Sequence, residues 1–437
     1  MGDEIRPFTI SIPDADLSDL HQRLRRTRFP TELEDAGNDH GAPLADIRRL
    51  VTYWAEEYDW RKAEAELNAL PHFTTTLQAS GGFEALDVHF VHMRSKRADA
   101  IPLLFAHGWP GSFLEATKLL NPLTAPPDDS TPAFHVVAPS LPGYGFSEAS
   151  KKRGFGADEI GEMFHQLMLR LGYDEYATQG GDWGFMITRA MGRRYAPEHV
   201  KAQHVNLNHF PQPSFWRNPG TFFRTMLAAL VTGFSEREKR GFARSRWFKD
   251  EGMGYFAMQS TRPQTIGYAL ADSPTALLAW IYEKLVDWTD SYPWTPDELC
   301  TWISIYWFST AGPRAAVQLY YEFTHASPSP SSSTHAQTQS KGNYGIGKDG
   351  GGSANDARSK ELTEFQDVKL ALAHFPRDVL LLPGYWGHGL GNLVYEKYHD
   401  KGGHFAAWEC PEAIVDDLRT MFGPNGGARG VIKTKGS

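Results

Sequence analysis

The first residue that could carry chemistry is Asp182, in the segment 179–184 with the sequence QGGDWG. A short run of β-forming residues precedes this segment, and a helical pattern follows it from Phe185 to Met191. This is the outline of a nucleophile elbow, a sharp strand-to-helix turn that raises its central side chain above a sheet. A carboxylate there can attack an electrophilic carbon and form an alkyl ester, which water must then cleave. Because glycine-flanked aspartates are mostly turn residues, the interpretation needs support from the rest of the chain.

An ester on Asp182 would be inert without a base that activates water. His404, in the segment 402–406 (GGHFA), follows a predicted strand late in the chain, and histidine has a suitable pKa for this task. Asp378, in 375–378 (FPRD), is the carboxylate expected to orient the ring, and Asp400 and Glu409 are alternatives close to the histidine in sequence. The order nucleophile, acid, histidine is that of α/β-hydrolase triads.

The elements that must position these residues are short apolar runs separated by helical stretches. The run 101–106 (IPLLFA) ends in 107–112 (HGWPGS), and the run 134–139 (FHVVAP) ends in 142–147 (PGYGFS). With the elbow segment, this pattern predicts an α/β fold with a mostly parallel sheet covered by helices on both faces. In such sheets the working residues gather at the carboxyl ends of the strands, where these glycine-rich turns lie.

The remaining segments divide the chain further. Residues 1–95 carry no α/β repeat; they predict a strand at 8–12, two amphipathic helices and a strand at 85–93, and we interpret them as an arm that clasps the main body. Residues 96–208 and 361–437 form the two parts of the core, and the aromatic-rich residues 209–325 are expected to form a helical cap. The Ser- and Gly-rich residues 326–360 are expected to form a mobile loop or linker.

Composition excludes several classes. The 437 residues are 41% hydrophobic and 22% charged, as in ordinary globular proteins, and the net charge of −8 argues against nucleic-acid binding. Two cysteines, Cys300 and Cys410, are too few for a disulfide framework or a cysteine zinc site. The polar N-terminus lacks the apolar run of a signal peptide, and no apolar run approaches the roughly 18 residues that span a bilayer. We therefore expect a soluble, cytoplasmic protein.

Together these motifs resemble those of the microsomal-type epoxide hydrolases, including soluble fungal and bacterial relatives that lack a membrane anchor. The resemblance covers nearly the whole chain. It includes the arm segments 12–14 (IPD), 27–30 (TRFP), 58–61 (YDWR) and 67–68 (LN), the loop 107–112, the elbow 181–184, the Phe-Pro pair before Asp378 and the histidine loop 402–406. It implies the α/β-hydrolase fold with a helical cap, and hydrolysis of an epoxide to a vicinal diol through a covalent aspartyl ester.

The resemblance also implies two cap tyrosines that hydrogen-bond the epoxide oxygen. The first matches Tyr255, and the second is Tyr320, with Tyr321 remaining open. Independently of the resemblance, a carboxylate opens a neutral epoxide slowly unless the developing alkoxide receives hydrogen bonds, which phenols can donate. The alternative interpretation is that both tyrosines only pack among the many aromatic side chains of this segment.

The expected oxyanion hole consists of the backbone N–H groups of Trp109 and Trp183, one of them directly after the nucleophile. We expect a small apolar epoxide as substrate, with an aryl substituent as one option, and neither a cofactor nor a metal. Because members of the family often associate, the resemblance also implies a homodimer.

Two other activities are compatible with an aspartate elbow. A haloalkane dehalogenase also uses an aspartate nucleophile, often followed by tryptophan, but it does not need paired cap tyrosines. The loop 107–112 and the N-terminal arm favour the epoxide interpretation. A noncatalytic ligand-binding relative is disfavoured because every expected catalytic position is retained, and a serine esterase is disfavoured because no serine occupies the elbow.

Overall fold

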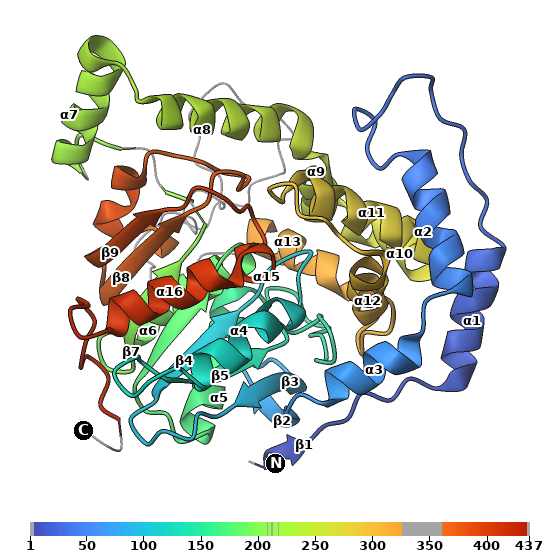
Figure 1. Cartoon of the computed structure of the whole chain (residues 1–437), viewed down its shortest axis with the longest axis horizontal. Helices are drawn as coiled ribbons and strands as arrows, with labels where there is room; N and C mark the ends of the chain where they lie inside the picture. Colours follow the sequence, from blue (N-terminus) through green and yellow to red (C-terminus); the bar gives the residue numbers. More distant parts are fainter. Residues whose placement is uncertain (1–3, 208, 211–212, 217, 326–360, 435–437) are drawn as a thin grey trace.

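The computed structural model describes residues 4–207, 209–210, 213–216, 218–325 and 361–434. Within these residues the centre of the molecule is a nine-stranded sheet with the order β1-β2-β3-β5-β4-β6-β7-β8-β9 (Figure 1). The strands are β1 (Arg6–Pro7), β2 (His72–Gln78), β3 (Ala85–Met93), β4 (Ile101–Ala106), β5 (Phe134–Pro139), β6 (Tyr176–Gly180), β7 (Val200–Val205), β8 (Gln366–His374) and β9 (Gly391–Tyr398).

The sheet has an antiparallel edge and a parallel centre. Strands β1, β2, β3 and β5 pair antiparallel in that order, whereas β5, β4, β6, β7, β8 and β9 pair parallel. The prediction of a mostly parallel sheet is therefore confirmed. Because β2 and β3 precede residue 95, the arm itself contributes strands to the sheet. The predicted domain boundaries at residues 95, 208, 325 and 360 remain a prediction.

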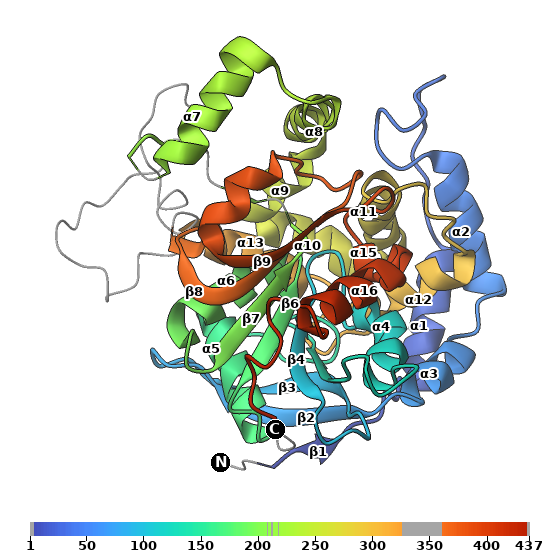
Figure 2. The ribbon, with the colours of Figure 1, turned by 60° about the vertical axis from the view of Figure 1, so that its left-hand side comes forward.

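Helices cover both faces of the sheet, as Figure 2 shows. One face carries α5 (Ala157–Arg170) and α6 (Trp183–Tyr195), which pack on each other. The other carries α4 (Leu114–Thr124), α15 (Ala406–Glu409) and α16 (Pro411–Phe422), which also contact one another. The central strands are buried from both sides: every residue of β5 and β6 is buried.

The described part of the segment between β7 and β8 is helical, as predicted for a cap. Its elements are α7 (Pro219–Leu227), η1 (Ala228–Thr232), α8 (Glu236–Trp247), η2 (Phe248–Gly252), α9 (Gly254–Thr261), α10 (Pro263–Asp272), α11 (Pro274–Asp287), α12 (Pro296–Trp307) and α13 (Ala315–His325). A short helix, η4 (Gly384–Leu390), follows β8. The expectation of a mobile loop at 326–360 lies outside the described residues.

The N-terminal arm lies against the cap. Helix α1 (Asp14–Arg25) contacts α11, and α2 (Leu44–Glu56) contacts α11 and α12. Polar side chains join the two parts: Tyr53 donates to Asp297 over 2.8 Å, and Tyr282 donates to Asp46 over 3.0 Å. Helix α3 (Trp60–Asn68) completes the arm.

The strand predicted at residues 8–12 is wrong. The alternation of buried and exposed side chains there is real, and the Phe8 N–H still donates to the His72 carbonyl of β2 over 2.9 Å, but from Ile10 on the backbone pairs with side chains of α3 instead of another strand. Asn68 bonds both the N–H and the C=O of Ile10 at 2.8 Å, and the Ile12 N–H donates to Glu64 over 2.7 Å. Among the helices that the structure describes, none has the length and apolar character needed to cross a bilayer.

Candidate active site

Asp182 lies at the turn between β6 and α6, in a backbone conformation that few residues other than glycine adopt. Its φ is 49° and its ψ is −126°. The turn is tight because a Cβ on Gly184 would lie 1.8 Å from the Ala106 carbonyl oxygen, and one on Gly180 would lie 2.5 Å from the Gly184 backbone. The glycines are therefore required on both sides, and the turn has the geometry of a nucleophile elbow.

The loop after β4 holds one oxygen of this carboxylate. The Trp109 N–H donates to Asp182 Oδ1 over 2.8 Å. Gly108 packs so closely that a Cβ there would lie 2.3 Å from Oδ1. Trp183 is the first residue of α6, where a backbone N–H has no partner within its helix. The two predicted oxyanion donors thus stand on the loop and on the helix that flank Asp182.

The other carboxylate oxygen faces His404, which the chain brings in from the loop after β9. His404 Nε2 lies 3.3 Å from Asp182 Oδ2, as an ion-pair contact without an aligned hydrogen bond. The His404 backbone N–H donates to the Trp288 carbonyl of the cap over 2.8 Å. Gly403 is needed for this approach, because a Cβ on it would lie 2.3 Å from the same carbonyl oxygen.

Asp378, on the loop after β8, holds the other side of the imidazole. Its Oδ1 lies 2.7 Å from His404 Nδ1 and also accepts the Val379 N–H over 2.7 Å. Burial disfavours the charged ring, but the charge of Asp378, its hydrogen bond to the ring and the close carboxylate of Asp182 raise the pKa of His404 to about 10. The other two carboxylates considered, Asp400 and Glu409, do not contact the ring; Glu409 accepts the Gly403 N–H over 2.7 Å and supports the loop.

The two cap tyrosines lie together above the elbow. The Tyr255 ring, on α9, stacks on Trp109 with ring centroids 4.9 Å apart. The Tyr320 ring, on α13, meets Trp183 edge-on at 4.8 Å and Tyr255 at 5.9 Å. Tyr321 instead turns outward, where its hydroxyl accepts from Arg153 over 3.2 Å. The structure therefore brings Tyr320, and not Tyr321, to Asp182.

Both phenols are kept protonated by their surroundings. Burial, followed by the charge of Asp182, raises the pKa of Tyr255 well above its ordinary value. Burial, followed by Tyr255 and Asp182, does the same to Tyr320. The Tyr320 hydroxyl is buried and has no hydrogen-bond partner among the described residues. An unpaired buried donor is costly unless a ligand completes it, so this hydroxyl is available to an oxygen placed beside Asp182.

Glu115, in the first turn of α4, is a site residue that the sequence analysis missed. It is buried, and burial raises its pKa to about 8. It lines a cavity of about 10 Å³ together with Asp182, His404 and Asn206, close to the room that one water needs. The sequence signal was a Ser112-x-x-Glu115 pattern, which predicts a surface capping box and not a buried acid.

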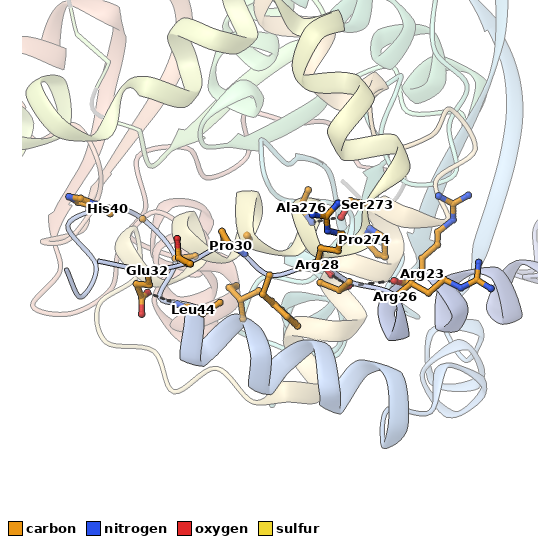
Figure 3. A pocket seen from close by; sticks show the side chains of 18 of the residues that line it. Arg23, Arg26, Arg28, Pro30, Glu32, His40, Leu44, Ser273, Pro274 and Ala276 are labelled. Carbon is orange, nitrogen blue, oxygen red and sulfur yellow. Dashed lines mark hydrogen bonds between the residues drawn. The ribbon is translucent and has the colours of Figure 1, made fainter. Parts of the chain in front are cut away.

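A larger cleft of about 730 Å³ lies elsewhere, between the arm and the cap (Figure 3). Its lining runs from Arg23 along the loop to Leu44 and faces Ser273 and Pro274 at the start of α11. None of the seven predicted site residues lines it. Cleft size therefore does not locate the chemistry, and the small cavity beside Asp182 is the better guide because the polar groups converge there.

Comparison with known proteins agrees with this geometry. The family model described as epoxide hydrolase N terminus matches residues 5–116, and that of the alpha/beta hydrolase fold matches residues 101–229. Epoxide hydrolase 1 of Sus scrofa is 34% identical over 443 residues, which cover 96% of this chain and 89% of the relative. The chain belongs to the epoxide hydrolase family. As an epoxide hydrolase it is a hydrolase, and a covalent aspartyl ester mechanism is general for this family.

Solved epoxide hydrolases share the whole architecture. The structure of Aspergillus niger epoxide hydrolase superposes with a TM-score of 0.75 at 33% identity, covering 95% of both chains. The juvenile hormone epoxide hydrolase of the silkworm Bombyx mori gives a TM-score of 0.80 at 29% identity, covering 95% of this chain and 93% of the other. The predicted fold and activity are confirmed, and the dehalogenase and noncatalytic alternatives are set aside.

Proposed function

We propose that Asp182 is the nucleophile of a two-step hydrolysis that converts an apolar epoxide into a vicinal diol. The observation that carries the proposal is the placement of the two carboxylate oxygens. Oδ1 accepts the Trp109 N–H, whereas Oδ2 lies 3.3 Å from His404 Nε2. Oδ2 is therefore the oxygen left for attack, and a base stands beside the ester that it would form.

In the first step, Asp182 Oδ2 bonds to an epoxide carbon as the C–O bond of the ring breaks. Tyr255 and Tyr320 hydrogen-bond the leaving oxygen, and one phenol gives it a proton. Because their pKa values are raised, both phenols are protonated donors at neutral pH. Esterification also removes the charge of Asp182, so His404 then holds its own proton less tightly and can give it to the phenolate that the first step leaves.

In the second step, neutral His404 takes a proton from water, and the water oxygen attacks the ester carbonyl of Asp182. Asp378 orients the ring and stabilises its positive charge. The N–H groups of Trp109 and Trp183 stabilise the oxyanion. Glu115 borders the cavity in which this water would sit, and its raised pKa keeps it a neutral hydrogen-bonding group at pH 7. The leaving oxygen takes the proton held by His404 as the diol departs, and the acid form of Asp182 then gives its proton to His404 and becomes a carboxylate again.

The surroundings of the two phenols support an apolar substrate. Trp109, Trp183 and Phe256 all make ring contacts with Tyr320, and Trp288 makes a ring contact with Tyr255. These aromatic side chains favour an epoxide with an apolar substituent, and an aryl group can make ring contacts with them.

The test is a single turnover of styrene oxide in heavy-oxygen water with enzyme in excess, followed by mass analysis of the peptides. We expect diol and one heavy oxygen in the peptide that contains Asp182. A His404→Gln variant should accumulate the alkylated peptide, while Asp182→Asn should form neither ester nor diol. Diol without label in that peptide, or rapid repeated turnover by His404→Gln, would overturn the proposed roles.

A homodimer and a cytoplasmic location are also proposed. Cys300 and Cys410 are both free and buried, as suits a reducing compartment. Light scattering during size-exclusion chromatography tests the dimer, and fractionation of the native cells tests the location.

A further inference from the structure

Helix α7 and η1 carry an apolar stripe that faces away from the protein. The stripe consists of Phe223, Met226, Leu227, Leu230 and Val231, whose exposed fractions are 58%, 39%, 52%, 74% and 75%. Their spacing is that of the core-facing side of an amphipathic helix. Here no residue of α7 or η1 is buried. The side that would normally enter a core is the side left in solvent.

Polar side chains of α7 make contacts with η4, while the rings of Phe222 and Phe223 contact that of Phe215. Thr225 Oγ1 accepts from Trp386 Nε1 over 3.1 Å and lies 3.3 Å from the Tyr385 hydroxyl. The Arg224 guanidinium lies 3.9 Å from the centre of the Tyr385 ring. Contacts with η4 therefore hold α7 with its apolar stripe toward solvent. A contiguous apolar patch that remains exposed is typical of an interaction site.

Positive charge accompanies the stripe. The sequence of α8 contains five basic and two acidic residues, in a chain whose net charge is −8. Lys239, Arg240 and Arg246 of α8 and Lys249 of η2 are exposed; Lys239 pairs with Glu236 over 2.7 Å, and the acidic Asp250 and Glu251 follow Lys249. Figures 1 and 2 both place α7 and α8 at the same end of the molecule, beyond β8 and β9.

We propose that the apolar stripe docks this end of the cap on an anionic lipid surface. Helix α7 and η1 have nine and five residues, too few to span a bilayer, so they would lie in the interface with the stripe among the acyl chains. The basic residues of α8 attract anionic headgroups. Trp216, 87% exposed, and Trp247, 39% exposed, are side chains that suit the headgroup level.

The charge pattern favours a lipid surface over a second copy of the chain. A second copy of the chain would carry the same basic residues on its own α8, so it offers them no opposite charge. An anionic surface instead gains from the same residues. This proposal does not depend on the roles assigned to Asp182 and its neighbours.

The experiment measures sedimentation of the full chain with large vesicles of phosphatidylcholine, alone or mixed with phosphatidylglycerol. We expect binding to the mixed vesicles, weaker binding to phosphatidylcholine alone, and weakening of both the binding and its anionic preference at about 0.5 M salt. Leu230→Ser combined with Val231→Ser should weaken binding by about tenfold or more. The matched control Leu33→Ser removes an apolar side chain that is 66% exposed on the arm, and it should bind like the native chain.

A second variant tests the charge. Arg246→Gln combined with Lys249→Gln should abolish the preference for phosphatidylglycerol, while hydrolysis of a water-soluble epoxide in the absence of lipid stays at the native rate. The proposal is overturned if the native chain does not bind mixed vesicles, or if the Leu230 and Val231 double variant binds them as tightly as the native chain. It is also overturned if that variant turns a dimer into a monomer and no vesicle binding is found, because the stripe is then an interface between copies.

Discussion

Replacing Asp182 by asparagine should lower the proton affinity of His404 by more than a thousandfold. In the free enzyme the imidazole lies between two carboxylates, with Nδ1 2.7 Å from Asp378 and Nε2 3.3 Å from Asp182. Despite burial, these neighbours raise its pKa to about 10, so the ring is charged at pH 7 and cannot accept a proton. Asparagine keeps the shape of the aspartate and removes its charge, as esterification does.

The magnitude follows from the distance. Two unit charges 3.3 Å apart interact by about 5 kcal/mol at an effective dielectric constant of about 20. Since about 1.4 kcal/mol corresponds to a factor of ten, this interaction is worth more than three orders of magnitude in proton affinity. The side chains of His404 and Asp182 are only 4% and 22% exposed, so water screens the pair little. The titration should therefore move from the alkaline range toward neutrality, where histidine works as a base.

Nuclear magnetic resonance of the ring nitrogens in histidine-labelled protein measures this titration directly. The chain has 17 histidines, and comparison with a His404→Gln variant assigns the signal. Asp400→Asn is the control, because it removes an exposed carboxylate near the histidine in sequence that does not contact the ring. An Asp182→Asn protein whose His404 still titrates in the alkaline range of the native enzyme would refute the reasoning, as would a native ring that is already neutral at pH 7.

Three further changes test the site and its supports by urea unfolding. Gly184→Ala should cost at least about 3 kcal/mol, because its Cβ would meet the Ala106 carbonyl oxygen at 1.8 Å, whereas Gly220→Ala, with nothing within 4 Å, should be tolerated. Burial alone would raise the pKa of Asp417, but its hydrogen bonds to two histidines and a tyrosine hold it below its usual value. Asp417→Asn should therefore cost about 3–5 kcal/mol near neutral pH, and the loss should shrink as the pH falls below about 4. Because the pKa of Glu115 is raised to about 8, its contribution to stability should be lost as the pH rises from about 4.5 to about 8. The stability of Glu115→Gln should therefore rise relative to that of the native protein over that range, and a difference that does not change with pH would contradict the assignment.

The sequence was sufficient to predict the elbow and the loops 107–112 and 402–406 because glycines mark them. A Cβ at Gly180, Gly184 or Gly403 would collide with backbone atoms, so each glycine reports a close approach that the fold requires. The apolar runs before the glycine-rich turns likewise identified β4 and β5, because both strands are buried on both faces.

The elements and residues that escaped prediction depend on partners from distant parts of the chain. Strand β7 contains Gln203 and His204, which break the apolar pattern, yet both are buried: Gln203 accepts from Arg189 over 2.9 Å. Glu115 likewise has the sequence pattern of an exposed capping box, but the structure shows that its side chain is buried. Side-chain patterns indicate which groups avoid water, but they do not identify the groups that replace water as partners.

The N-terminal arm is connected to the proposed base through the contacts of the cap. The arm helices α1 and α2 pack on α11, and the residue that caps the C-terminal end of α11 is Trp288. The carbonyl of Trp288 accepts the backbone N–H of His404 over 2.8 Å, and its ring meets the imidazole edge-on at 5.0 Å. The cap therefore holds the base of the proposed second step as well as the tyrosines of the first. The arm, α11, Trp288 and His404 thus form one continuous chain of contacts that ends beside Asp182.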